Sequence, residues 1–85
     1  IYNRMEVIEN PKEVSRMSVW KFVVNVRGIK VGVVVNEDLY DEEFKYYKLK
    51  DDLSEFKEFD FDGEELEDDV LSEDEKYEIF DIWRS

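Results

Sequence analysis

The fold is decided by the stretch Ser18–Asn36, which reads SVWKFVVNVRGIKVGVVVN. Its first half largely alternates apolar and polar side chains, which is the period of a β-strand with one buried face. A valine-rich second half follows Gly28-Ile29, and glycine at the first position of a two-residue loop favours a type II′ turn. The pattern therefore predicts a β-hairpin over residues 18–36. Its expected cross-strand pairs on one face are Val26 with Val31, Val24 with Val33, and Phe22 with Val35.

Two weaker patterns precede the hairpin. Residues 1–9 fit a further strand in which Met5 and Val7 are partly buried. The order Asn10-Pro11 places a capping residue before a proline at the first helical position, where the missing N–H of proline costs nothing. This order predicts one or two helical turns that end at about Met17.

Two further segments follow the hairpin. Residues 44–49, FKYYKL, fit a third strand that is tied to the hairpin by an acidic loop over residues 36–43. In residues 51–61 the spacing of the apolar side chains favours a helical turn and then a short extended piece. We expect that extended piece to end at Asp62-Gly63.

The last segment predicts a helix from about Glu73 to Arg84. Ser72 and Glu75 have the spacing of a capping box, in which each side chain bonds the other residue's backbone N–H. The apolar side chains of this helix form a stripe: Ile79, Phe80 and Trp83, flanked by Tyr77. We therefore expect a single small domain of the α+β class over residues 1–85. In it, a small antiparallel sheet built on the 18–36 hairpin packs against the C-terminal helix.

The charges are sorted along the chain. Residues 1–35, the basic half with the hairpin, carry six Lys/Arg against three Glu, a net charge of +3. Residues 36–85 carry six Lys/Arg against 21 Asp/Glu, a net charge of −15. Such a field attracts cationic surfaces and repels nucleic acid and anionic membranes. We expect the carboxylates of the acidic half to gather into one continuous patch.

Catalysis and metal binding are disfavoured by the residue types present. The chain has no His and no Cys, so it lacks the usual general base, the thiol nucleophile and the commonest metal ligands. Glu58, Asp60 and Asp62-Gly63 resemble the first half of an EF-hand calcium loop. The resemblance then fails, because Glu65 stands at the apolar position and Asp69 at the twelfth. We expect no enzyme, no cofactor and no dedicated metal site.

Direct contact with nucleic acid or with a membrane is not expected either. The cations of the basic half, Lys21, Arg27 and Lys30 with Arg16, would lie on one hairpin face, but the net charge of −12 repels a duplex before contact. The chain shows no apolar run long enough to span a bilayer and no signal-peptide pattern. The cytoplasm is therefore the expected compartment.

The strong negative charge of residues 36–85 predicts that the protein binds a basic partner. In size and composition the chain is similar to phage-encoded DNA mimics that block restriction or CRISPR nucleases, and to immunity proteins and antitoxins that cap a nuclease. We expect an acidic inhibitor that occupies a basic, nucleic-acid-handling surface of another protein by DNA-like charge mimicry. The expected contact residues are carboxylates with two aromatic anchors: Asp51, Asp52, Glu64, Glu65, Glu67, Asp68, Asp69, Tyr46 and Tyr47.

A different class of function also fits the composition. The chain fits an accessory subunit of a larger assembly whose charged halves pair with a neighbour, or a homodimer formed by its own two halves. Few thermolabile side chains and many Lys and Glu suit a thermophilic source. An AT-rich phage genome accounts for the same bias equally well.

Overall fold

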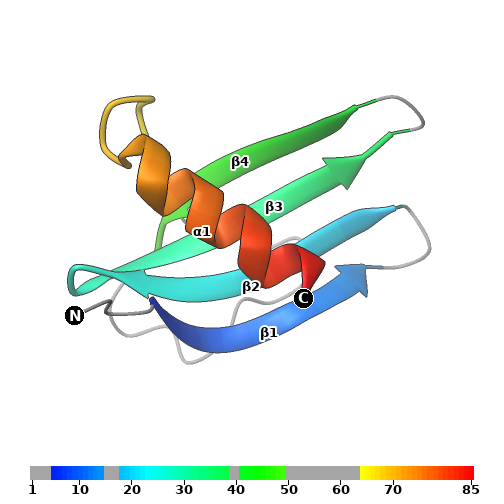
Figure 1. Cartoon of the computed structure of the whole chain (residues 1–85), viewed down its shortest axis with the longest axis horizontal. Coiled ribbons are helices and arrows are strands. Elements are labelled where there is room, and N and C mark those ends of the chain that lie inside the picture. The colour runs from blue at the N-terminus through cyan, green and yellow to red at the C-terminus, as the bar shows by residue number, and fades with distance from the viewer. Residues whose placement is uncertain (1–4, 15–17, 39–40, 50–63) are drawn as a thin grey trace.

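An antiparallel sheet with one helix on one of its faces makes up the part of the chain that the computed structural model describes, residues 5–14, 18–38, 41–49 and 64–85 (Figure 1). Each strand lies beside the one that precedes it in the chain. The elements are β1 (Glu6–Val14), β2 (Val19–Val26), β3 (Ile29–Glu37), β4 (Glu42–Lys48), the two-residue β5 (Glu64–Glu65) and the helix α1 (Glu73–Arg84). The predicted α+β fold is confirmed.

The hairpin of β2 and β3 is present, but its predicted register is wrong by two residues. The loop residues are Arg27 and Gly28, whose φ angles of 51° and 84° are both positive, as a type I′ turn requires. The side chain of Asn25 supports this loop, because its Oδ1 accepts a hydrogen bond of 2.9 Å from the Gly28 N–H. The observed cross-strand pairs are Val26 with Ile29, Val24 with Val31, Phe22 with Val33, and Trp20 with Val35. A shift of two leaves every side chain on its predicted face.

The helical turns predicted to end at about Met17 are wrong where the structure describes them. Residues 10–14 belong to β1, and Val14 pairs with Val19 of β2. Hydrogen bonding to a neighbouring strand outweighs the local capping signal there. Pro11 is tolerated because it lies on an edge strand, within the shift of register between Glu9 and Lys12, where the missing N–H of proline breaks no regular ladder. Met5 and Val7 are partly buried against the core, as expected.

The strand predicted over residues 44–49 is confirmed as β4, which begins two residues earlier. Its register against β3 pairs Val33 with Tyr46 and Gly32 with Tyr47. Because β3 and β4 are both longer than predicted, the acidic loop between them is shorter than residues 36–43. The turn and extended piece expected over residues 51–61, and their end at Asp62-Gly63, lie outside the described residues.

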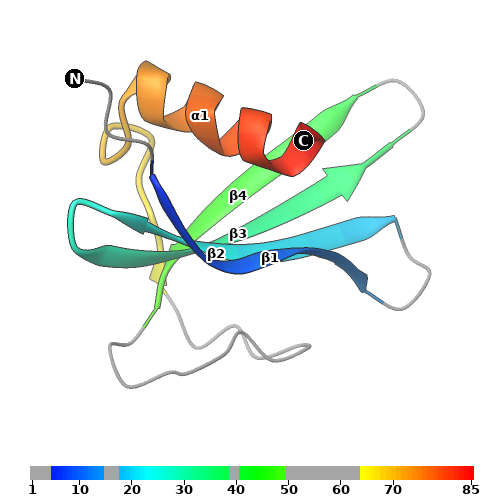
Figure 2. The same ribbon diagram turned by 60° about the horizontal axis from the view of Figure 1, so that its bottom comes forward.

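The predicted C-terminal helix and its capping box are confirmed. The Ser72 Oγ accepts from the Glu75 N–H at 3.2 Å, and the Glu75 Oε1 accepts from the Ser72 N–H at 2.9 Å. The helix lies across the sheet on one side (Figure 2). Its buried residues are Ile79 and Ile82, which pack on the face of the hairpin that carries Phe22. The predicted stripe thus missed Ile82, and Tyr77 is 73% exposed.

The face of the sheet opposite α1 carries a second apolar cluster. Val23, Val34 and Leu49 are buried there, with Tyr47 packed against them. Lys21 lies on the same face and is only 2% exposed. Gly32 leaves room for the Leu49 side chain, which would lie 3.1 Å from a Cβ at that position.

Candidate functional site

The most acidic described segment runs from β5 into the first turn of α1. Residues 64–75 read EELEDDVLSEDE, which is eight acids and no Lys or Arg in twelve residues. Its apolar residues face inward, since Leu71 is buried and Leu66 packs against the core. The Leu66 N–H donates to the Tyr46 carbonyl at 2.8 Å, which fixes the segment to the edge of β4. Six of its acids are therefore left exposed on a segment that is anchored by Leu66 and Leu71.

Three further contacts hold the segment in one conformation. The Lys76 Nζ donates to the Asp68 carbonyl at 3.0 Å, which ties the turn to the helix. The guanidinium of Arg27, in the β2–β3 loop, donates to the Val70 carbonyl at 2.8 Å and to the Glu75 carboxylate at 3.0 Å. The two bonds from Arg27 join residues that are more than forty positions apart in the chain. They tie the acidic segment to the β2–β3 loop, so the sheet sets the position of the acids.

We call the exposed carboxylates of this segment the acidic surface. Its members are Glu65, Glu67, Asp68, Asp69, Glu73 and Asp74. Within the described residues, none of these six side chains forms an ion pair. Glu73 and Asp74 also lie at the N-terminus of α1, where the helix dipole favours negative charge. The dipole therefore offsets part of the repulsion between the acids.

Two titratable groups beside the acidic surface have altered pKa values. The pKa of Glu75 is lowered, first because the Ser72 backbone N–H donates to its carboxylate and further because Arg27 lies beside it. Burial raises the pKa of Tyr46, and the negative charge of Glu73 raises it further. Glu75 is thus an ionised part of the scaffold, whereas Tyr46 stays neutral beneath the helix.

The structure brings together four of the predicted contact residues. Glu65, Glu67, Asp68 and Asp69 are all exposed within the acidic surface. Glu64 lies beside them in β5, where its backbone pairs with Lys48. Asp51 and Asp52 lie outside the described residues. Glu73 and Asp74 were not among the predicted contact residues, and their proximity to the predicted acids along the chain was the signal that they extend the same surface.

The two predicted aromatic anchors are not side by side. Tyr46 and Tyr47 are consecutive residues of β4, so their side chains point to opposite faces of the sheet. Tyr46 packs against the core on the helix face, and Tyr47 packs on the cluster of the other face. A flat partner surface on one side of the sheet therefore meets only one of them.

The described acids of residues 36–85 do not form a single patch. A second group, Glu37, Asp38, Asp41, Glu42 and Glu43, lies at the β3–β4 loop, at the opposite end of β4 from β5 (Figure 1). The seven residues of β4 span roughly 20 Å at about 3.3 Å per residue. Within the described residues, the acids expected to form one continuous patch therefore form two separate groups, one at each end of β4.

The hairpin cations do not stand together as an exposed basic face in the described structure, where Lys30 of β3 is partly buried. Lys21 is buried, and Arg27 makes the contacts to Val70 and Glu75 described above. At the other end of α1, the Arg84 guanidinium lies 4.0 Å from the Glu42 carboxylate and 5.7 Å from the Phe80 ring centroid. Arg27 and Arg84 therefore contact the chain's own acidic half, while Arg16 lies outside the described residues.

In the ranges that the structure describes, no three acidic side chains are grouped so that they could hold a metal ion. No helix among these residues combines the length and the apolarity needed to cross a membrane. The EF-hand-like residues Glu58, Asp60 and Asp62-Gly63 lie outside the described ranges. Comparisons with protein-family models, with curated proteins and with solved structures gave no match.

Proposed function

We propose that the protein is an acidic binding protein that inhibits a basic, nucleic-acid-handling partner by occupying the surface on which that partner binds DNA or RNA. The cytoplasm is the proposed place of this interaction. The observation that supports the proposal is the acidic surface, six exposed carboxylates within ten residues that make no ion pair in the described structure. Self-repulsion among such charges costs stability, and binding to a cationic surface offsets that cost.

The spacing of the charges supports mimicry of nucleic acid. Duplex DNA carries one negative charge per roughly 1.7 Å of its axis, and its partners are lined with Lys and Arg. A short folded segment with neighbouring carboxylates presents the same sign of charge to these residues. The contacts of Arg27 and Lys76 hold the segment before binding, so less conformational entropy is lost on association.

The proposed mechanism has an electrostatic step and a steric step. The charge of −12 speeds association with a cationic surface, and this gain weakens as salt screens it. Once bound, the folded domain blocks access of nucleic acid to that surface. The protein itself performs no chemical step in this proposal.

The test compares two variants with the same change in charge. In the first, Glu65, Glu67, Asp68 and Asp69 of the acidic surface are replaced by lysine. In the matched control, four exposed acids elsewhere are replaced by lysine: Glu13, Asp41, Glu43 and Asp81. Immobilised wild-type protein captures binding proteins from a lysate, mass spectrometry identifies them, and the affinity of each variant for the identified protein is measured.

We expect the first variant to bind the partner at least about a hundredfold more weakly, while the control loses far less. Circular dichroism of both variants checks that the fold is retained. Equal weakening in the two variants would mean that net charge alone attracts the partner. Unchanged affinity in the first variant would remove the acidic surface from the interface.

A second candidate function is self-association through the edge of the sheet. Among the described strands, β5 covers β4 only at Tyr47 and Lys48, so Glu42–Lys45 pair with no described strand on that side. Open strand edges of this kind pair with other chains. Sedimentation at low and high salt separates the two candidates, because the inhibitor is a monomer until its partner is added, whereas the assembly protein forms oligomers alone.

A further inference from the structure

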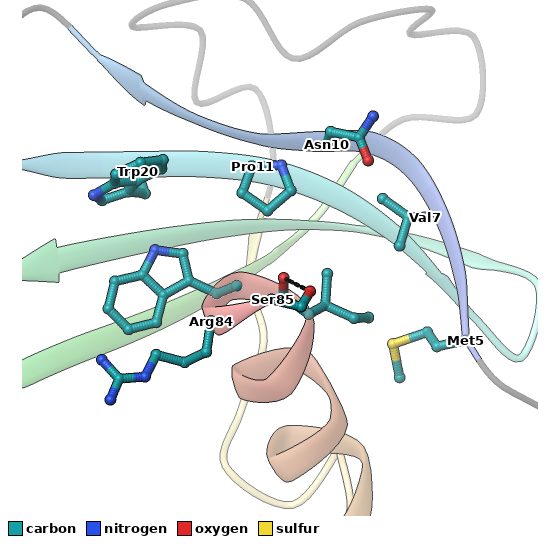
Figure 3. Close-up of a pocket in the computed structure, with 9 residues that line it drawn as sticks. Met5, Val7, Asn10, Pro11, Trp20, Arg84 and Ser85 are labelled. Carbon is teal, nitrogen blue, oxygen red and sulfur yellow. Dashed lines mark hydrogen bonds between the residues drawn. The ribbon is translucent and has the colours of Figure 1, made fainter.

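A groove lies between the β1–β2 edge of the sheet and the C-terminal half of α1. It has a volume of about 770 Å³, within the size range of ligand sites in proteins. Figure 3 shows Val7 and Pro11 on β1 with their side chains directed toward the end of the helix at Ser85. Trp20 and Trp83 also line this groove, and both are only partly buried. Apolar side chains from three elements thus remain accessible at one place.

Each of the two tryptophans has a charged neighbour at the rim. The Trp20 Nε1–H donates to the Glu37 Oε2 at 3.2 Å. The Arg84 guanidinium lies 5.9 Å from the Trp83 ring centroid and reaches Glu42 on the side of β4. The groove therefore keeps an apolar wall, and among its described lining residues the one cation, Arg84, is paired with a carboxylate.

A second cavity of about 450 Å³ continues the groove toward the N-terminus of α1. The two cavities share Met5, whose N–H donates to the Glu78 Oε1 at 2.8 Å. The second cavity is lined by three carboxylates, those of Glu6, Glu75 and Glu78, and by one cation, Arg27. Arg27 is paired with Glu75, and within the described residues neither Glu6 nor Glu78 forms an ion pair, so their charges face a ligand.

The two cavities together follow the helix from Glu75 to Ser85. Ten residues of helix span about 15 Å at about 1.5 Å per residue. An extended peptide covers that length with roughly four or five residues. The two cavities thus form one longer groove, which is acidic at one end and apolar and aromatic at the other. A short extended peptide is long enough to reach both ends.

We propose that this groove binds an extended peptide segment of a partner, with Lys or Arg side chains beside Glu6 and Glu78 and a large apolar side chain between Pro11 and the two tryptophans. The charge of the acidic cavity selects the cationic end of the segment, and the apolar cavity selects its anchor. None of the six carboxylates of the acidic surface lines either cavity, so this site is separate from that surface.

The test uses synthetic peptides and the isolated, ¹⁵N-labelled chain. The probe is acetylated, amidated Lys-Lys-Ser-Trp-Ser, and two further peptides carry Ala for Trp or Glu for both Lys. The chain contains two Trp, whose indole N–H signals report directly on the apolar cavity. We expect the probe to shift these signals and both changed peptides to bind at least tenfold more weakly.

Two pairs of variants locate the site. Pro11→Trp fills the apolar cavity, and its control Ile8→Trp adds the same ring at an exposed position of β1 that lines neither cavity. Glu6→Lys reverses a charge of the acidic cavity, and its control Glu13→Lys reverses an exposed charge on the same strand. We expect each cavity variant to weaken binding of the probe at least fivefold and each control to leave it within twofold.

Several results would overturn the proposal. The first is that the indole signals do not shift at a millimolar concentration of the probe. The second is that the Ala peptide binds as tightly as the probe, and the third is that Glu6→Lys and Glu13→Lys weaken binding of the probe equally. Indole shifts that follow protein concentration without peptide would assign the groove to a second copy of the chain instead. A thermal melting curve reports whether the Pro11→Trp variant folds. The comparison of Glu6→Lys with Glu13→Lys tests the proposal even if it does not fold. Since the acidic surface is unchanged in all four variants, failure here leaves the proposed function standing.

Discussion

Replacing Glu75 with alanine removes two contacts that hold the acidic surface in place. The carboxylate accepts the Ser72 N–H at 2.9 Å within the capping box, and it pairs with Arg27 at 3.0 Å. Loss of a helix cap costs about 1 kcal/mol. An ion pair whose arginine is largely exposed adds about 0.2–1 kcal/mol. We therefore expect Glu75→Ala to lower the free energy of unfolding by roughly 1–2 kcal/mol.

The assay is urea unfolding at neutral pH, followed by tryptophan fluorescence and circular dichroism. Glu73→Ala is the matched control, because Glu73 lies in the same helical turn and is exposed. It shares the favourable interaction with the helix dipole, so the difference between the two variants isolates the cap and the ion pair. In thermal melts, each kcal/mol corresponds to a shift of about 4–8 °C in Tm for a domain of this size. Equal losses in the two variants would refute the role given to these contacts.

Two other predictions concern stability. Because the fold lowers the pKa of Glu75, the stability that this carboxylate contributes is complete at neutral pH and is lost as the pH falls through its folded-state pKa. Urea midpoints at about pH 7 and about pH 3 should therefore differ less for Glu75→Gln than for the wild type, and an unchanged difference would contradict the shift. Ile79→Ala, at a fully buried position, should cost about 2–5 kcal/mol in the same urea assay. Ile8→Ala, at a position 40% exposed, should cost about 0.5 kcal/mol or less, and similar losses would contradict the assigned core.

The hairpin shows how far pattern reasoning reaches in this chain. Alternation correctly placed Phe22 and Val24 on the core face, because that face depends only on whether a residue is odd or even along the strand. The register depends on the loop instead. Glycine preference pointed to Gly28-Ile29, whereas the loop is Arg27-Gly28, with Asn25 bonding the Gly28 N–H. A non-glycine residue at positive φ is uncommon, so this loop could not be chosen from propensity alone.

The first strand was predicted only in part, because residues 6–9 of β1 fall within the strand expected over residues 1–9, whereas residues 10–14 were expected to be helical. Asn10-Pro11 carries a real helix-start signal, but that signal is local and worth little beside a ladder of hydrogen bonds to β2. The helix α1 was predicted correctly because its capping box, its apolar spacing and its packing on the sheet all agree. Local signals thus succeeded where tertiary contacts reinforced them.

The candidate site was predictable in its charge and less so in its shape. The acids of residues 64–75 could be read directly from the sequence, and four predicted contact residues lie together there. The division of the acids between the two ends of β4 depends on the sheet topology, which the sequence patterns did not specify. The opposite orientation of Tyr46 and Tyr47, by contrast, follows from the period of the predicted strand. The groove beside α1 depends on the continuation of β1 through Asn10 and Pro11, which the sequence pattern assigned to a helix.

The most direct test of the proposed function is a competition between this protein and DNA for the captured partner. Labelled duplex DNA is bound to that partner, and unlabelled wild-type protein is titrated in at low and moderate salt. We predict that the wild type displaces the DNA, and that the variant with lysine at Glu65, Glu67, Asp68 and Asp69 needs at least tenfold more protein. A stable complex that holds the DNA and this protein together, or equal displacement by the variant, would contradict the account.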